Sequence, residues 1–236
     1  MRNWFTAIWW VTTQKYGASA EGLQQVLGLK SYETAWTWLH KIRKAMVVFN
    51  RSMLSGTVEI DECYIGGKAE GGKPGRGSEN KTLVAVTVEL DGKKLGRIRL
   101  QIIKDASFES WCSFITENIE QGSKIVSDSW TGLSRIETKG YKRVVYKQSA
   151  ASCKEEMLPH VLLVISLLKR WLLGTHQGAV DPKYLQAYLD EYAFRFNRRK
   201  SAKRGLLFYR LLENAMIVEP STLTDIMTEH SLESSR

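Results

Sequence analysis

Asp61 is the residue of this sequence whose setting points most clearly to chemistry. It lies in the segment Gly56–Gly67, GTVEIDECYIGG, where Glu59, Asp61 and Cys63 alternate mainly with apolar residues. Because side chains alternate across a strand, this pattern predicts a strand with these three residues on one face. Rigid backbone would then present the Asp61 carboxylate. The pattern is equally typical of an ordinary half-solvated strand whose polar side faces water.

A second carboxylate, Asp128, follows another short apolar run at Ser123–Val126. We expect this run to be a strand that stops at Asp128. Mg²⁺ prefers one or two protein carboxylates and leaves its other positions to water and phosphate. Two aspartates at two strand positions therefore predict a divalent-metal site.

The hydrophobic pattern also predicts the elements that would position these aspartates. Thr82–Leu90 is a nearly continuous apolar run, which is typical of a buried central strand. Leu95–Ile103 alternates, and predicts a strand near the sheet edge whose solvated side carries Arg97 and Arg99. The remaining expected helices lie at Ser107–Glu120, near Trp130–Thr138, at Pro159–Leu173 and at Tyr184–Phe196. The remaining expected strands are the one that ends at Asp128 and a short one at Arg143–Tyr146.

The first fifty residues predict a small helical module. Helices are expected at Trp4–Gln14 and Ser19–Leu27, and a third begins at Ser31 and is basic toward its end. This is a helix-turn-helix pattern, and the excess of Lys and Arg in residues 1–50 suits contact with phosphates. The alternative is a three-helix packing module with an aromatic core.

Five motifs occur in a fixed order: VEIDECYIGG, GKPGRG at Gly72–Gly77, GSKIVSDSWTG, SLLKRWLLGTHQG at Ser166–Gly178, and YLDEYAFRFNRR at Tyr188–Arg199. Together they closely resemble bacterial insertion-sequence transposases of the DDE superfamily, in the branch that opens with Val-Glu-x-Asp-Glu and closes with Arg-x-Asn-Arg-Arg. The resemblance covers nearly the whole chain. It implies an α/β, ribonuclease H-like (retroviral-integrase-like) fold, with a mixed five-stranded sheet and flanking helices. The order of strands and helices expected above agrees with that fold.

The resemblance also implies metal-dependent strand cleavage and strand transfer of an insertion sequence. Asp61 and Asp128 match the first two members of the catalytic trio and would hold two Mg²⁺ ions, for which Mn²⁺ can substitute. The implied partners are the ends of the element and the target DNA, bound by at least a homodimer. The third member of the trio stands seven residues before a helical lysine. Counting back from Lys169 gives Leu162, which cannot bind a metal.

This departure leaves three interpretations open: an active transposase, a catalytically impaired DNA-binding derivative, and a metal-dependent nuclease of the same fold. His160 lies on roughly the opposite helix face from Leu162, and Glu155 and Glu156 precede the helix, so none is an obvious replacement. The basic segments at both ends of the chain favour the first two interpretations. We expect weak or absent cleavage with an intact fold and intact DNA binding.

Positive charge is the second functional signal. The net charge of +9 and the pI of about 9.4 point to an anionic partner, most commonly nucleic acid. Such charges are also typical of a solvated surface, and Glu191 and Arg195 have the spacing of an intrahelical ion pair. With the resemblance, the pattern predicts DNA contacts from Lys41, Arg43, Lys44, Lys73, Arg76, Lys169, Arg170, Arg195, Arg198 and Arg199.

We expect three segments along the chain. They are a helix-turn-helix-like module at 1–50, a ribonuclease H-like catalytic domain at 51–215, and a disordered tail at 216–236. Family members usually carry a zinc ribbon before the helical module, and this chain begins after that place.

Cysteine usage and the apolar start bear on where the protein works. Cys63, Cys112 and Cys153 form no C-x-x-C pair, which disfavours a disulfide framework and a cysteine-based zinc site. The apolar start is too short for a membrane span and lacks a cleavage signature. We therefore expect a cytoplasmic, nucleoid-associated protein without a membrane anchor.

Overall fold

The structure is a computed structural model that describes residues 1–47, 51–66, 81–146, 158–177 and 180–233. The chain forms two compact units. One contains Arg51–Arg170, and the other combines Met1–Asn50 with Trp171–Arg236. The first boundary agrees with the one expected near residue 50. The second differs, because the helices after Trp171 group with the N-terminal helices and not with the sheet.

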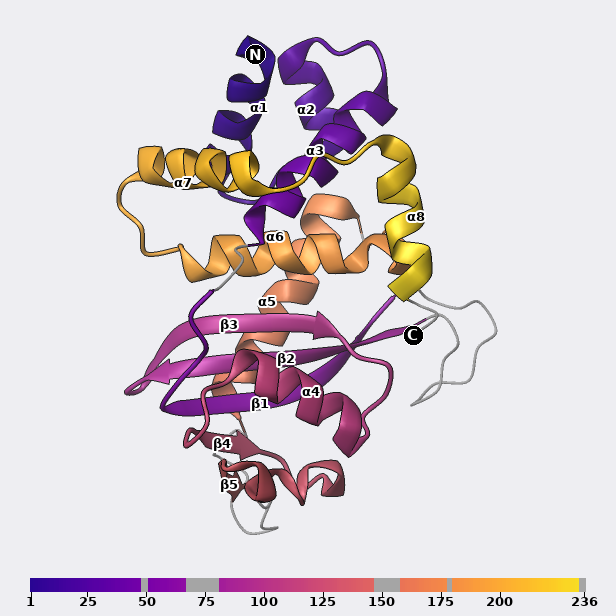
Figure 1. Ribbon diagram of the computed structural model, residues 1–236. Coiled ribbons are helices and arrows are strands. Elements are labelled where there is room, and N and C mark those ends of the chain that lie inside the picture. The colour runs from indigo at the N-terminus through magenta and orange to yellow at the C-terminus, as the bar shows by residue number, and fades with distance from the viewer. Residues whose placement is uncertain (48–50, 67–80, 147–157, 178–179, 234–236) are drawn as a thin grey trace. The chain divides into compact units, whose positions relative to one another are not determined.

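A five-stranded mixed sheet forms the centre of the unit Arg51–Arg170 (Figure 1). Its strands are β1 (Thr57–Ile65), β2 (Thr82–Asp91), β3 (Lys94–Ile102), β4 (Lys124–Ser127) and β5 (Lys142–Val145). They lie in the order β3-β2-β1-β4-β5, with β1, β2 and β3 antiparallel and with β4 and β5 parallel to β1. This order and these directions are those of the ribonuclease H-like fold, so the predicted fold class is confirmed.

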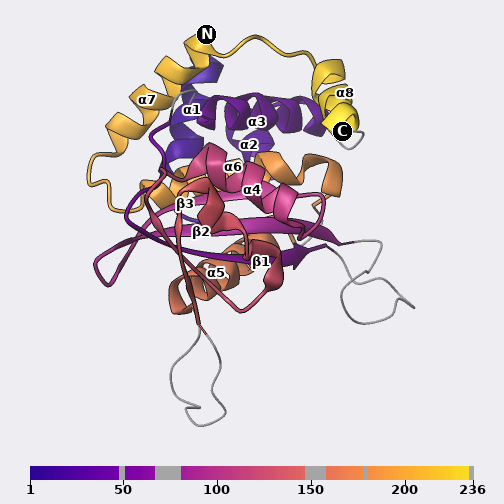
Figure 2. The same ribbon diagram turned by 60° about the horizontal axis from the view of Figure 1, so that its bottom comes forward.

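Helix α4 (Phe108–Asn118) and the first part of α5 (Pro159–His176) lie on opposite faces of this sheet (Figure 2). The α4 face is a hydrophobic core in which Val58 and Ile60 of β1 pack with Trp111 and Phe114. The other face of β1 carries Glu59, Asp61 and Cys63. The alternative of a half-solvated strand with its polar side in water is wrong, because Glu59 and Cys63 are each only 5% exposed.

Two local predictions in this unit also need correction. The helix expected near Trp130–Thr138 is instead two short 3₁₀ turns, η1 (Thr131–Leu133) and η2 (Ile136–Lys139). Arg99, expected on a solvated side, is 4% exposed and donates to the Ser52 carbonyl at 2.8 Å. Its strand is the sheet edge as predicted, but residues before β1 cover that face.

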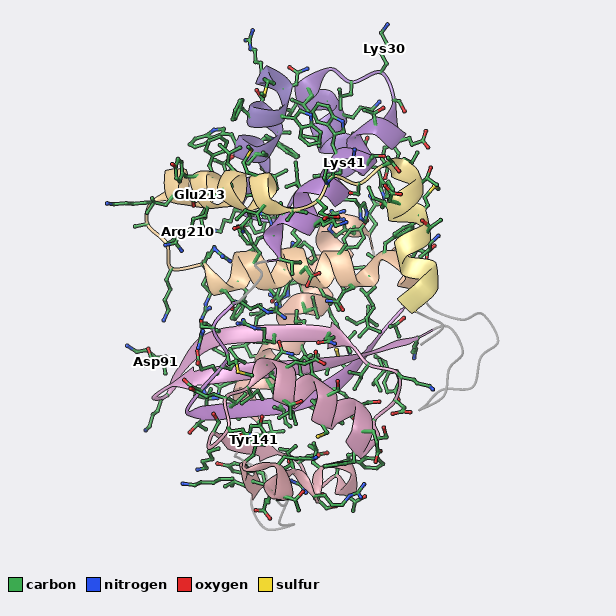
Figure 3. All side chains as sticks on the ribbon, in the orientation of Figure 1. Lys30, Lys41, Asp91, Tyr141, Arg210 and Glu213 are labelled. Carbon is green, nitrogen blue, oxygen red and sulfur yellow. The ribbon has the colours of Figure 1, made fainter. Side chains whose placement is uncertain are left out.

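The other unit is helical. It contains α1 (Arg2–Thr13), α2 (Ala20–Leu27), α3 (Tyr32–Met46), the end of α5, the 3₁₀ turn η3 (Pro182–Tyr184), α6 (Leu185–Asn197), α7 (Arg204–Ile217) and α8 (Leu223–Glu233). Ser19 and Ser31 cap α2 and α3 by accepting hydrogen bonds from the backbone N–H groups of Gly22 and Thr34. Lys30 and Arg210 extend from this unit into solvent (Figure 3). In the described residues, no helix is both long and apolar enough to cross a membrane.

The disordered tail expected at 216–236 is also wrong for the residues that the structure describes. Helix α8 occupies Leu223–Glu233. Its start is stabilised by reciprocal bonds, because the Thr222 N–H donates to Asp225 and the Asp225 N–H donates to the Thr222 hydroxyl. Ile226 is 4% exposed, so the helix buries an apolar residue that composition alone did not single out.

Candidate metal centre

Asp61, in the middle of β1, and Asp128, directly after β4, lie at the same level of two neighbouring parallel strands. In the pairing of β1 with β4, Glu59 is opposite Val126. Asp61 and Asp128 each come two residues further along, and a shift of two residues keeps a side chain on the same face of the sheet. The predicted proximity of the two carboxylates therefore follows from the observed register.

The electrostatics of Asp61 agree with this placement. Burial, together with the nearby Asp128 charge, raises the pKa of Asp61 to about 6, against the opposing effects of the hydrogen bond from Glu62 N–H at 2.9 Å and of the Lys169 charge. Two carboxylates that repel each other in a half-buried place are stabilised by a bound cation. The pair fits a divalent metal ion, which prefers carboxylate oxygens.

A turn after β4 holds Asp128 in place. Its Oδ1 accepts the Trp130 N–H at 3.0 Å, and the Trp130 indole donates to the Ala106 carbonyl at 3.1 Å. The Arg143 guanidinium donates to the Trp130 carbonyl at 2.7 Å, to the Asp128 carbonyl at 3.2 Å and to the Ser127 hydroxyl at 3.2 Å. Arg143 therefore holds the backbone carbonyls of Asp128 and Trp130 and the side chain of Ser127, and nothing in the sequence pattern marked it for this role.

Leu162, which the resemblance places at the third-ligand position, lies on α5 and is 42% exposed. His160 is not a substitute, because both of its ring nitrogens have other partners: Nδ1 lies 2.7 Å from Oε1 of Glu59, and Nε2 lies 3.3 Å from the carbonyl oxygen of Lys93. Burial raises the pKa of the Cys63 thiol to about 12, so it stays protonated and is a poor ligand. Glu155 and Glu156 lie outside the described residues, within which no three acidic, His or Cys side chains group as metal ligands.

The predicted DNA contacts divide into distinct groups. Lys169 and Arg170 are exposed on α5, and Lys41 and Lys44 are partly buried on α3. Arg198 is partly buried and Arg199 is exposed, and each lies over the ring of a phenylalanine, Phe194 for Arg198 and Phe196 for Arg199. Lys73 and Arg76 lie outside the described residues.

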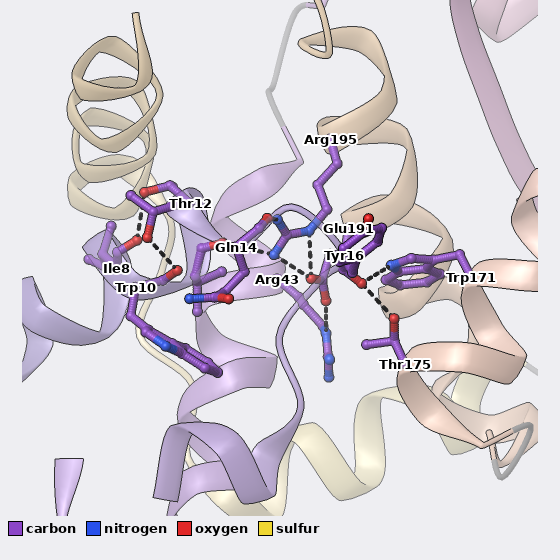
Figure 4. Close-up of polar contacts among 12 residues, drawn as sticks. Ile8, Trp10, Thr12, Gln14, Tyr16, Arg43, Trp171, Thr175, Glu191 and Arg195 are labelled. Carbon is purple, nitrogen blue, oxygen red and sulfur yellow. Dashed lines mark hydrogen bonds and ion pairs between the residues drawn. The ribbon is translucent and has the colours of Figure 1, made fainter. Parts of the chain in front are cut away.

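Two of the predicted DNA contacts are wrong. Arg43 is 2% exposed and its Nε donates to Glu191, so it cannot reach a phosphate. Arg195 donates to Glu191 and to the carbonyls of Gln14 and Val11, which uses all of its guanidinium nitrogens (Figure 4). The intrahelical pair of Glu191 with Arg195 was the correct alternative.

A comparison with protein families gives a match over more than half of the chain. Residues 53–197 match the family model described as the ISXO2-like transposase domain. No curated protein matches the chain.

Several solved structures share a distant likeness. The catalytic core domain of BIV integrase is 16% identical, with a TM-score of 0.43 over 77% of this chain and 99% of that one. The Mos1 transposase of a pre-cleavage transpososome is 12% identical, with a TM-score of 0.35 over 92% and 79%. The Drosophila P element transposase of a strand transfer complex is 10% identical, with a TM-score of 0.33 over 97% and 62%. Because the sequence identities and TM-scores are this low, no function is assigned to this chain from these structures.

Proposed function

Because the chain belongs to the ISXO2-like transposase domain family, we propose that it acts on the DNA ends of an insertion sequence through Asp61 and Asp128. The observation that carries this proposal is the placement of these two carboxylates on neighbouring strands, inside the matched residues. The Asp128 charge contributes to the raised pKa of Asp61, which supports the proximity of the two carboxylates.

The two carboxylates would hold Mg²⁺, or Mn²⁺ in its place. When bound, such ions supply an activated water or 3′-hydroxyl and neutralise charge at the phosphodiester. The chain itself orients the site: β1 presents Asp61, and the turn held by Arg143 presents Asp128. Lys169 brings positive charge close to Asp61, where it would meet a DNA phosphate.

The substrate would be the terminal ends of the element together with target DNA. Exposed Lys169 and Arg170, with Lys41 and Lys44 on α3, would contact phosphates. Binding should therefore weaken steeply as salt rises, because each phosphate contact releases condensed counterions. Joining two ends requires at least two copies of the chain, so we expect a homodimer or larger assembly on DNA, in the cytoplasm with the nucleoid.

Leu162 favours a second candidate function, a DNA-binding derivative with impaired catalysis. Two carboxylates are enough for one loosely held ion, and a leucine at the third position provides no oxygen for a second. On this basis, cleavage by the natural chain should be weak or absent, while DNA binding should be intact.

The test is incubation of the protein with labelled element ends and Mg²⁺, with binding and cleavage scored separately. Asp61→Asn and Asp128→Asn should each remove any Mg²⁺-dependent cleavage and leave binding largely intact, because they change metal ligands and no phosphate contact. A variant that cleaves as well as the parent would exclude that aspartate from the site. Binding that does not depend on salt would contradict the basic-surface argument.

A further inference from the structure

Glu59 has an unusual environment for a carboxylate on a strand. It is 5% exposed, and its oxygens face three donors of α5. Oε2 accepts the backbone N–H groups of His160 at 3.0 Å and Val161 at 2.9 Å, and Oε1 lies 2.7 Å from Nδ1 of the His160 ring. A buried carboxylate with this many donors is well compensated for its loss of water.

These contacts supply the hydrogen-bond acceptors that the sequence of α5 lacks at the start of the helix. The first N–H groups of a helix have no partner within the helix, and a side chain at the N-cap usually accepts them. Leu158 occupies that place and has no side-chain acceptor, and Pro159 has no N–H. The next two N–H groups belong to His160 and Val161, and Glu59 accepts both. Its negative charge also suits the positive end of the helix dipole.

His160 adds a second attachment at the same point. While Nδ1 faces Glu59, Nε2 of the ring lies 3.3 Å from the carbonyl oxygen of Lys93, in the turn between β2 and β3. The first turn of α5 therefore contacts the sheet at two places, at Glu59 of β1 and at Lys93 in the turn between β2 and β3.

The point of attachment matters because α5 runs along β1. Lys169 contributes to the pKa values of both Asp61 and Cys63, so its charge lies near that part of the strand. The four residue steps from Glu59 to Cys63 extend about 14 Å at 3.4 Å per strand residue. Nine residues from His160 to Lys169 extend about 13.5 Å at 1.5 Å per helix residue. The two elements therefore run in the same direction, and a fixed start sets the height of every later residue of α5 along β1.

We propose that Glu59 is a positioning residue, which with His160 anchors the first turn of α5 to the strand that carries Asp61. The anchor fixes where position 162 and Lys169 stand relative to the two aspartates. Its relevance to the metal centre rests on the proposed function, while the anchor itself does not.

Amide hydrogen exchange measured by NMR on the full chain tests the anchor directly. Glu59→Gln replaces one of the two accepting carboxylate oxygens by an NH₂ group, which donates and cannot accept. The backbone amide protons of His160 and Val161 should then exchange with solvent about tenfold faster or more. The amides of α4 should not change. His160→Asn keeps the Glu59 carboxylate and should give a smaller acceleration. The control is Glu109→Gln, an acid in the first turn of α4 that is 75% exposed, and it should leave all of these amides unchanged. Unchanged exchange of His160 and Val161 in Glu59→Gln would overturn the proposal.

A double-mutant cycle on Mn²⁺ affinity then separates positioning from simple charge. The parent would bind Mn²⁺ through Asp61 and Asp128, neither of which lies on α5, whereas Leu162→Glu adds a ligand on α5. Glu59→Gln removes the same charge from the parent and from Leu162→Glu, so a pure charge effect lowers the Mn²⁺ affinity of both equally. If Glu59 positions α5, Glu59→Gln should lower the Mn²⁺ affinity of Leu162→Glu by about fivefold or more beyond its effect on the parent.

Equal losses in both backgrounds would show that Glu59 acts on the site only through its charge, and would overturn its positioning role. If Leu162→Glu gives no gain in affinity, the ligand placement in the proposed function is wrong, and the exchange measurement alone decides the anchor.

Discussion

Arg43 on α3 donates from Nε to Oε2 of Glu191 on α6 at 2.8 Å, and both side chains are at most 2% exposed. Arg195 donates to the other carboxylate oxygen (Figure 4). Burial alone would raise the pKa of Glu191, but the two guanidinium groups lower it to about 2. The Glu191 carboxylate thus links α3 to α6, which are far apart in the sequence. Arg43 and Arg195, which we expected to bind DNA, instead bind this carboxylate.

Glu191→Gln should strongly destabilise the helical unit, because it leaves two buried guanidinium groups without a counter-charge. Breaking a buried pair in this way costs about 3 kcal/mol or more. Urea unfolding followed by circular dichroism measures the loss. Glu213→Gln on α7 is the matched control, since Glu213 is exposed, and it should change the free energy of unfolding by less than about 0.5 kcal/mol. Equal effects of the two variants would contradict a stabilising role for the Glu191 cluster.

His176 should make the helical unit less stable in mild acid. Burial, and then the Arg43 charge, lower the pKa of His176 from 6.5 to about 4. The unfolded chain therefore takes up a proton between these values while the folded chain does not. Stability from this residue is complete above pH 6.5 and falls as pH decreases toward 4, by up to about 3 kcal/mol. Urea unfolding at several pH values should show a smaller dependence in His176→Phe than in the parent, and an identical dependence would contradict the assignment.

Arg143 should support metal binding without touching the metal. Arg143→Ala frees the backbone carbonyls of Asp128 and Trp130, and loss of such a support typically weakens metal affinity about tenfold or more. Mn²⁺ titration measures the change, and the urea midpoint checks that the fold is kept. Arg135→Ala is the control, because the Arg135 side chain contacts Glu109 and the ring of Phe108 instead of the turn that holds Asp128. If both variants bind Mn²⁺ alike, the turn does not depend on Arg143.

Asp61→Asn should stabilise the metal-free protein at pH 7 to 8. The raised pKa means that ionised Asp61 is unfavourable in the folded state, through burial and through Asp128. Removing this charge should add on the order of 1–2 kcal/mol to the free energy of unfolding. Thermal unfolding in a chelator measures it, with Asp105→Asn as a control at an exposed carboxylate outside the site. A lower melting temperature for Asp61→Asn would contradict the electrostatic account.

The sequence was sufficient for features that local pattern determines. Alternation and apolar runs predicted β1, β2 and β3 closely, and Ser19 and Ser31 marked two helix starts. Asp61 was singled out because it lies within a strand pattern and Asp128 because it follows one, although their proximity depended on the resemblance until the register was known.

Features that depend on tertiary contacts were missed. The alternation of β1 says which residues share a face with Glu59, but not that α5 covers that face. Likewise, the charge of Arg43 looks the same in the sequence whether it meets a phosphate or Glu191. Arg143 lies fifteen residues from Asp128 in the sequence, and its role arises only from the parallel pairing of β4 with β5.

The most direct test of the account is the rate of Mn²⁺-dependent cleavage of labelled element ends by Leu162→Glu. Leu163→Glu is the control, because Leu163 is similarly exposed but lies about 100° further around α5. We predict that Leu162→Glu cleaves faster than the parent, that Leu163→Glu does not, and that adding Asp128→Asn to Leu162→Glu abolishes the gain. Efficient cleavage by the parent, or cleavage by Leu162→Glu that survives Asp128→Asn, would contradict a metal centre built on Asp61 and Asp128 with its third ligand missing.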